Sequence, residues 1–280
     1  MENTKYCTFI DVLGYGELVK DKTISVDHKI RILNSIYSSI AGHFSTTINE
    51  INAKVVDKIF IRSFSDCFYL ECDKLEPIIV ATNRIFNWTF GFYSSFSFNE
   101  KRTPLLRAGI VKDWTVKFKD IGGIINNTTE INPVGLGVAR AYWTSEKSNL
   151  SGMRIIISPE VFADLYTQPV SNKSIECFGI DIIENDVPIP YFFTHISVDE
   201  KNNLTDLYEL IWSFDGMSDC FYEYIDELEK LKPTFNDLSK RHFKETAKVL
   251  LSGLLLSDCK SRTINIFDNQ KKKLENMIAW

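Results

Sequence analysis

Two aspartates stand where strand ends and turns commonly place reactive groups. Asp11 lies near the end of the apolar, β-prone segment KYCTFIDVL, and Asp66 lies between the strand-like segments KIFIRS and CFYLEC. Two carboxylates and a backbone carbonyl suit Mg²⁺ or Mn²⁺, which prefer oxygen ligands and share them with substrate phosphates. For either aspartate taken alone, a turn-forming or helix-capping role is the alternative.

A glycine turn, Gly14-Tyr15-Gly16, follows Asp11 and could offer backbone N–H groups to a phosphate. The sequence has no GxxxxGK[ST] or GxGxxG phosphate loop and no GxSxG nucleophile elbow. Its four histidines are dispersed, and its six cysteines show no CxxC or zinc-like pairing. The aspartate pair beside a glycine turn is therefore the constellation that favours chemistry, and that chemistry is metal-assisted phosphate handling.

The elements that must position these residues run β-α-β-β-α-β. The patterns predict strands over 5–13, 58–63, 67–72 and 105–111, with helices from Ser25 onward and over 75–98. Either Ser25 or Asp27 is expected to cap the first helix. This order predicts an α+β, ferredoxin-like core, in which the first and third strands are neighbours and bring both carboxylates to one end of the sheet.

Later segments add to this core. A polar, glycine-containing stretch spans 112–131, and helical patterns cover 134–146 and 159–166. Further strands are predicted over 154–158, around 175–183 and around 191–196. After the polar DEKNN segment, helical patterns cover 204–232 and 236–256. We therefore expect one domain over 1–198 and a helical C-terminal extension over 199–280.

Composition limits the classes of function. The chain has 280 residues, 44% of them hydrophobic, and a formal net charge of −5. This length suits one large globular domain with a short second unit. An acidic chain is poorly suited to non-specific binding of duplex nucleic acid. No apolar run reaches the roughly 18 residues of a transmembrane helix, and the N-terminus lacks signal-peptide features, so a cytoplasmic protein is expected.

Four segments resemble motifs of the class III nucleotidyl cyclases. FIDVLGYGELV is similar to the first metal motif of that family, and SFSDCFYLE to the second. LRAGIV resembles the R-x-G-[IV] strand, and PVGLGVARAYWTSE resembles the G-x-x-[VI]-x-x-A region. All four occur in family order over about residues 5–146. The resemblance implies a phosphorus–oxygen lyase, in which the ribose 3′ oxygen attacks the α-phosphorus and pyrophosphate leaves.

The resemblance also implies roles for individual residues. Two divalent ions, Mn²⁺ or Mg²⁺, would be bound by Asp11, Asp66 and the carbonyl of Val12. Gly14, Tyr15 and Gly16 would cradle phosphate oxygens, and Arg107 would contact the polyphosphate; a strand-end surface arginine is the alternative for Arg107. The family works as homodimers with active sites at the interface, so Arg62 would act on the site of the other protomer.

Departures from the family pattern concern the base and the transition state. Purine cyclases commonly carry Lys or Glu four residues before the second aspartate, where this chain has Arg62. Arginine donates hydrogen bonds and accepts none, so it suits the carbonyls of uracil, or O2 and N3 of cytosine, better than the amino group of adenine. Asn132 occupies the second base-selecting position in place of the usual Asp or Cys. The family's transition-state Asn and Arg fall on Ala139 and Trp143, and the lysine expected before the final strand is missing.

This pattern resembles the pyrimidine cyclases of Pycsar antiphage systems. The resemblance implies conversion of UTP to 3′,5′-cyclic UMP, a second messenger that activates a separate effector protein in bacterial antiphage defence. UTP is favoured slightly over CTP because uracil offers two carbonyl acceptors to an arginine. The alternatives are a cytidylate cyclase that makes cyclic CMP, or a non-catalytic, cyclase-like module that binds nucleotides for regulation.

Overall fold

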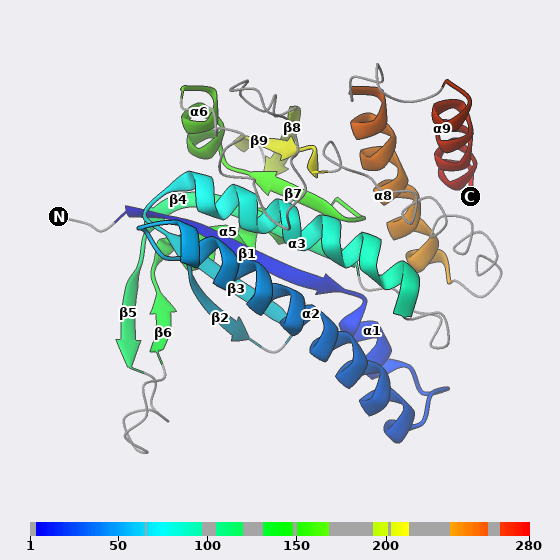
Figure 1. Ribbon diagram of the computed structural model, residues 1–280, viewed down its shortest axis with the longest axis horizontal. Coiled ribbons are helices and arrows are strands. Elements are labelled where there is room, and N and C mark those ends of the chain that lie inside the picture. Colours follow the sequence, from blue (N-terminus) through cyan, green and yellow to red (C-terminus); the bar gives the residue numbers. More distant parts are fainter. Residues whose placement is uncertain are drawn as a thin grey trace.

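A seven-stranded mixed sheet of strand order β2-β3-β1-β4-β7-β9-β8 organises the computed structural model (Figure 1). The structure describes residues 4–64, 66–96, 105–119, 131–147, 150–167, 193–200, 203–212, 236–256 and 264–280. The strands of this sheet are β1 (Thr4–Leu13), β2 (Phe60–Phe64), β3 (Cys67–Cys72), β4 (Leu105–Trp114), β7 (Arg154–Ile157), β8 (Phe193–Glu200) and β9 (Asn203–Leu210). Neighbouring strands are antiparallel except β4 and β7, which are parallel. The α+β, ferredoxin-like core predicted from the sequence is confirmed.

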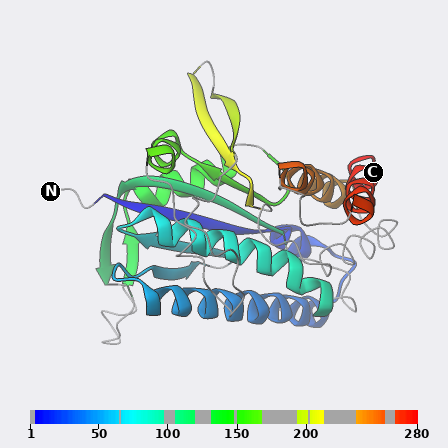
Figure 2. The ribbon, with the colours of Figure 1, turned by 45° about the horizontal axis from the view of Figure 1, so that its top comes forward.

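Helices α2 (Val26–Lys54) and α3 (Leu75–Phe96) run alongside each other on one face of the sheet (Figure 2). Alternate strand residues point toward them because successive side chains of a strand face opposite sides. The main apolar core forms there, with Ile10, Leu70 and Ala108 from the strands and Ile78 and Phe86 from α3 fully buried. Of the two predicted caps for α2, Ser25 is the one observed: its hydroxyl accepts from the His28 N–H at 3.3 Å.

The opposite face carries α5 (Leu136–Lys147), which packs on β1 and β4 over a small second core around Cys7, Phe9 and Ala141. The helix approaches β4 closely because Gly109 has no side chain. A Cβ at that position would lie 2.3 Å from the Ala141 carbonyl oxygen. This second face is the one on which Asp11 lies, two residues beyond Phe9 on β1.

Three short elements differ from the sequence predictions. The predicted turn at Gly14-Tyr15-Gly16 leads directly into a short helix, α1 (Tyr15–Lys20). The polar stretch predicted over 112–131 includes the end of β4 and β5 (Val116–Lys119), which pairs with β6 (Ile131–Val134) in a separate two-stranded sheet. By contrast, helix α6 (Pro159–Thr167) agrees with the helical pattern predicted over 159–166.

The helix predicted over 204–232 is wrong for its first residues, which form β9. The sequence pattern fits a helix, because apolar residues recur at the spacing of one helix face: Leu204, Leu207, Tyr208 and Ile211. The edge of β7 nevertheless pairs with this segment, and Leu207, Leu210 and Ile211 are buried. The rest of that predicted helix and the strand predicted around 175–183 lie outside the described residues.

The C-terminal region contains α8 (Asp237–Leu256), as predicted over 236–256, and α9 (Ile264–Ile278). The boundary predicted after residue 198 falls within β8, and a wholly helical region over 199–280 is wrong because β9 belongs to it. The main core continues into both helices through Phe243, Leu250 and Leu274. The division into two domains stays a prediction. Among the described helices, none has the length and apolarity needed to cross a membrane.

Candidate metal centre

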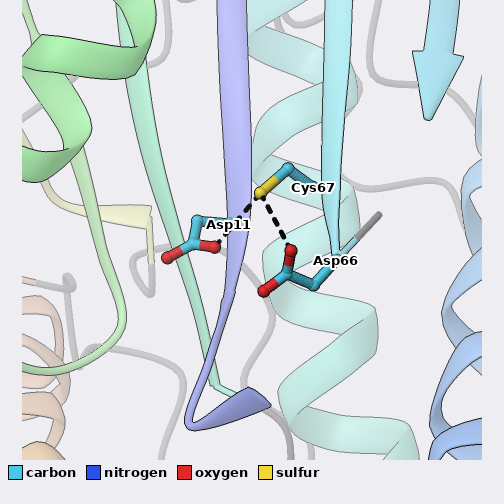
Figure 3. Close-up of side chains that lie close together, drawn as sticks. All are labelled: Asp11, Asp66 and Cys67. Atoms are coloured by element: carbon cyan, nitrogen blue, oxygen red, sulfur yellow. Dashed lines mark hydrogen bonds between the residues drawn. The ribbon is translucent and has the colours of Figure 1, made fainter. Parts of the chain in front are cut away.

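Asp11, Asp66 and Cys67 lie together at one end of β1 and β3 (Figure 3). Asp11 is directly opposite Cys67 in the register of these strands, and Asp66 is the residue before β3 begins. The Val12 N–H donates to the Asp66 carbonyl at 3.2 Å, which ties the hairpin turn to β1. One potential ligand atom from each of the three residues lies within 4.8 Å of the other two. The convergence of the two aspartates is therefore a property of strand pairing.

The Cys67 thiol lies between the two carboxylates. It donates to Asp11 Oδ1 at 3.3 Å, and its sulfur lies 3.7 Å from Asp66 Oδ1. Burial raises the pKa of the Cys67 thiol, and the negative charges of Asp11 and Asp66 raise it further. The thiol is therefore protonated in this arrangement and acts as a hydrogen-bond donor.

Arg107 supplies a positive charge to the same centre. It lies opposite Asp11 on β4, and its Nη2 is 3.1 Å from Asp11 Oδ2. The same nitrogen contacts Glu146 near the end of α5. Sequence reasoning identified Arg107 but missed Glu146, because this contact depends on how α5 crosses β4 and no local motif signals it.

Tyr142, one helical turn before Glu146, borders the centre. Its ring packs edge-on against Phe9, with ring centroids 5.2 Å apart. The charge of Glu146 raises the pKa of the Tyr142 phenol, with burial and the charge of Asp11 as smaller causes. On the other side, burial raises the pKa of Tyr37 on α2, and Asp66 is the next cause. Two phenols thus flank the carboxylates.

The glycine turn directly follows β1. Gly14 has a φ of +85°, a conformation that favours glycine, and its carbonyl accepts from the Leu18 N–H at 3.0 Å to begin α1. Tyr15 packs its ring edge-on against Tyr37, with centroids 6.3 Å apart, and a Cβ on Gly16 would meet no atom within 4 Å. The turn is thus anchored beside the carboxylates, and its phosphate role stays a prediction.

The two predicted base-selecting residues lie on other elements. Arg62 is on β2, opposite Tyr69 of β3. Asn132 is on β6 and pairs with Phe118 of β5, in the two-stranded sheet rather than in the sheet that carries Asp11. Their role toward a nucleotide base stays a prediction.

Comparisons with known proteins give structural likeness without sequence likeness. No family model matches the chain, and no curated protein matches it. The guanylyl cyclase Cya2 superposes with a TM-score of 0.50 at 10% identity, over 74% of this chain and 91% of that one. The guanylyl cyclase domain of the RhoGC fusion protein from the aquatic fungus Blastocladiella emersonii superposes with a TM-score of 0.49 at 12% identity, over 75% of this chain and 96% of that one. A bacterial light-regulated adenylyl cyclase superposes with a TM-score of 0.48 at 10% identity, over 81% of this chain and 97% of that one. The likeness to Cya2 establishes the fold.

Proposed function

We propose that this protein is a nucleotidyl cyclase, which converts a nucleoside triphosphate into a 3′,5′-cyclic monophosphate and pyrophosphate. The observation that carries the proposal is the convergence of Asp11 and Asp66 at one end of β1 and β3. It occurs within a fold shared with a guanylyl cyclase. Paired carboxylates of this kind serve divalent ions that bind phosphates.

The carboxylates fit a hard divalent ion, because they provide the oxygen ligands that Mg²⁺ and Mn²⁺ prefer. Asp11 and Asp66 would hold two such ions, with the Val12 carbonyl as a further ligand. When bound, the ions supply activation of the ribose 3′ oxygen and neutralisation of the triphosphate charge.

Arg107 would bind phosphate oxygens beside these carboxylates. Its side chain is only 12% exposed, and its buried Nε has no hydrogen-bond partner among the described residues. Asp11 and Glu146 fix the position of the guanidinium, whose terminal N–H groups would donate to phosphate oxygens. Gly14, Tyr15 and Gly16 would add backbone N–H groups to the phosphate site.

A homodimer with sites at the interface belongs to this proposal. Large apolar side chains are exposed on β5, β6 and α5: Val116, Phe118, Val134, Leu136 and Tyr142. Phe118 is 58% exposed. Exposed apolar side chains gathered on neighbouring elements favour a protein–protein contact. Size-exclusion chromatography with light scattering tests the dimer, and a monomer at all concentrations would contradict it.

Arg62 and Asn132 support a pyrimidine substrate. Arg62 would donate to the carbonyl oxygens of uracil, which makes UTP the favoured substrate, cyclic UMP the product and a cyclic-nucleotide-responsive effector the partner, in cytoplasmic antiphage defence. CTP and cyclic CMP are the alternative within the enzyme class. A non-catalytic module that binds nucleotides is the alternative outside it, and it is favoured by the residues Ala139 and Trp143 at the transition-state positions.

Incubation of the purified full chain with Mn²⁺ and each of the four ribonucleoside triphosphates tests the proposal, with products identified by liquid chromatography and mass spectrometry. We expect cyclic UMP and pyrophosphate. Asp66→Asn should abolish turnover, whereas Asp73→Asn, a change at an exposed carboxylate of the same hairpin, should retain it. Cyclic product from a purine alone would refute the pyrimidine assignment. Nucleotide binding without any cyclic product would refute the cyclase.

A further inference from the structure

We infer that Cys67 is a third protein ligand of the metal centre and gives it a preference for a thiophilic divalent ion such as Zn²⁺ over Mg²⁺. The inference rests on the proposed function only in taking Asp11 and Asp66 as metal ligands. It concerns which ion the protein binds, and it can be tested without a nucleotide.

The donor atoms of Cys67 and the two aspartates are gathered closely enough to serve one ion, since all three lie within 4.8 Å of one another. Zinc lies about 2.3 Å from a cysteine sulfur and about 2.0–2.2 Å from a carboxylate oxygen, so two such ligands at angles of roughly 90–110° are about 3.1–3.6 Å apart. The Cys67 sulfur lies 3.3 Å from Asp11 Oδ1 and 3.7 Å from Asp66 Oδ1. The sulfur and Asp11 Oδ1 are already at ligand spacing, and a small inward rotation of the Asp66 side chain would bring its oxygen to the same ion.

The position of the sulfur is fixed by the sheet. Cys67 is the first residue of β3, where it pairs with Asp11 on one side and with Phe64 of β2 on the other. Its side chain is half-buried against the small second core. A ligand on a paired strand is held more rigidly than one on a loop, so the sulfur stays beside the carboxylates.

The donor set distinguishes between metals. Mg²⁺ takes oxygen ligands almost exclusively, whereas Zn²⁺ accepts sulfur and carboxylate oxygen together. Binding exchanges the thiol proton for the ion: the S–H bond breaks, a sulfur–metal bond forms and the proton passes to solvent. A mixed sulfur and oxygen site therefore strengthens Zn²⁺ binding and leaves Mg²⁺ binding to the carboxylates alone.

Titration of the reduced full chain with Cd²⁺, a spectroscopic substitute for Zn²⁺, tests the inference. Sulfur-to-cadmium charge transfer gives ultraviolet absorption that carboxylates do not give. We expect this band in the wild type and in Cys72→Ser, and its loss in Cys67→Ser. Cys72 is a matched control because it lies on the same strand but faces the helices, where its thiol donates to the Asp57 carbonyl at 3.3 Å.

Calorimetric titrations with Zn²⁺ and with Mg²⁺ complete the test. Loss of an outer partner of a ligand already costs about 10–100-fold in metal affinity, so Cys67→Ser should weaken Zn²⁺ binding by at least about tenfold. Binding of Mg²⁺ should be unchanged. An undiminished cadmium band in Cys67→Ser, or equal weakening for both ions, would overturn the inference.

Failure of the cyclase proposal is seen separately, as absence of cyclic product, and leaves the cadmium band unaffected.

Discussion

Arg107 on β4 and Asp11 on β1 are register partners on adjacent strands, with Nη2 of the arginine 3.1 Å from Oδ2 of the aspartate. The same guanidinium also contacts Glu146 of α5. An ion that binds Asp11 therefore competes with a positive charge that is already present. Glu146 reduces this competition because it shares the guanidinium.

Glu146→Gln should weaken the binding of divalent ions. Without the Glu146 charge, Arg107 relies on Asp11 as its carboxylate partner and competes more strongly with a metal. A partly exposed ion pair contributes up to about 1 kcal/mol, so the loss should be about twofold to fivefold in affinity. Calorimetric titration with Mn²⁺ measures it. Glu160→Gln, which removes a carboxylate paired with Arg140, should bind Mn²⁺ as the wild type does, and tighter binding by Glu146→Gln would contradict the competition.

Gly109→Ala should destabilise the protein through α5. The new methyl group would lie 2.3 Å from the Ala141 carbonyl oxygen and 2.6 Å from the Ser145 nitrogen, so the helix must move. Overpacking of this kind costs about 1–3 kcal/mol, and more where backbone must shift. Urea unfolding followed by circular dichroism measures the free energy of unfolding. Gly42→Ala, on α2 with open space around it, should instead stabilise by about 0.5–1 kcal/mol. Equal effects of the two changes would show that α5 does not pack against β4 as described.

Arg154→Met should cost about 3–5 kcal/mol of unfolding free energy, because it leaves a buried acid without its cation. Arg154 Nη1 lies 2.6 Å from Glu209 Oε2, and both side chains are less than 10% exposed. Burial raises the pKa of Glu209, and the charge of Arg154 offsets part of that rise. Denaturant unfolding measures the change. Lys271→Met removes one partner of a surface pair with Glu275 and should cost less than about 1 kcal/mol. A loss as small in Arg154→Met would contradict the burial of this pair.

Acid should weaken the attachment of α8 through His242. The His242 Nδ1 accepts from the Gly152 N–H at 3.1 Å, so it must be unprotonated. Burial lowers the pKa of His242, and the charges of Arg107 and Arg241 lower it further. Below the ordinary histidine pKa of about 6.5, the unfolded chain binds more protons than the folded one, so stability falls as pH falls.

Thermal unfolding at pH values above and below the ordinary histidine pKa of about 6.5 measures the effect. The wild type should lose more stability on acidification than His242→Asn, whose amide oxygen occupies the place of Nδ1 and can accept the Gly152 hydrogen bond at either pH. His28→Gln, at the start of α2, should show the acid sensitivity of the wild type. The same sensitivity in all three proteins would contradict the role of His242.

The sequence was sufficient for elements with an unambiguous period. The strand predicted over 67–72 has the bounds of β3, and α3 begins where the helix predicted over 75–98 begins and follows it to the end of the described residues at Phe96. Residues 204–210 fit two periods, and pairing with β8 and with the edge of β7 selects the strand. The strands β5 and β6 have four residues each and pair only with each other within the described sheets, which is too little for a pattern to reveal.

The candidate site divides in the same way. Asp11 and Asp66 are predictable because a strand end and a hairpin turn are local features. The nearness of Cys67 depends on the register between β1 and β3, and the contact of Glu146 depends on the crossing of α5 over Gly109. Neither the register nor the crossing is encoded in a short motif, so sequence reasoning could not place these two side chains.

The partners of Arg154 also set an order for events during synthesis. Glu209 and Glu245 follow it by 55 and 91 residues along the chain. A nascent chain that has completed β1 to β7 on the ribosome therefore carries an uncompensated guanidinium where a buried one is required. The charge of Arg154 is fully balanced only when β9 and α8 both pack against β7. A chain truncated before β9 should therefore leave the Arg154 guanidinium unpaired and β7 more accessible to proteases.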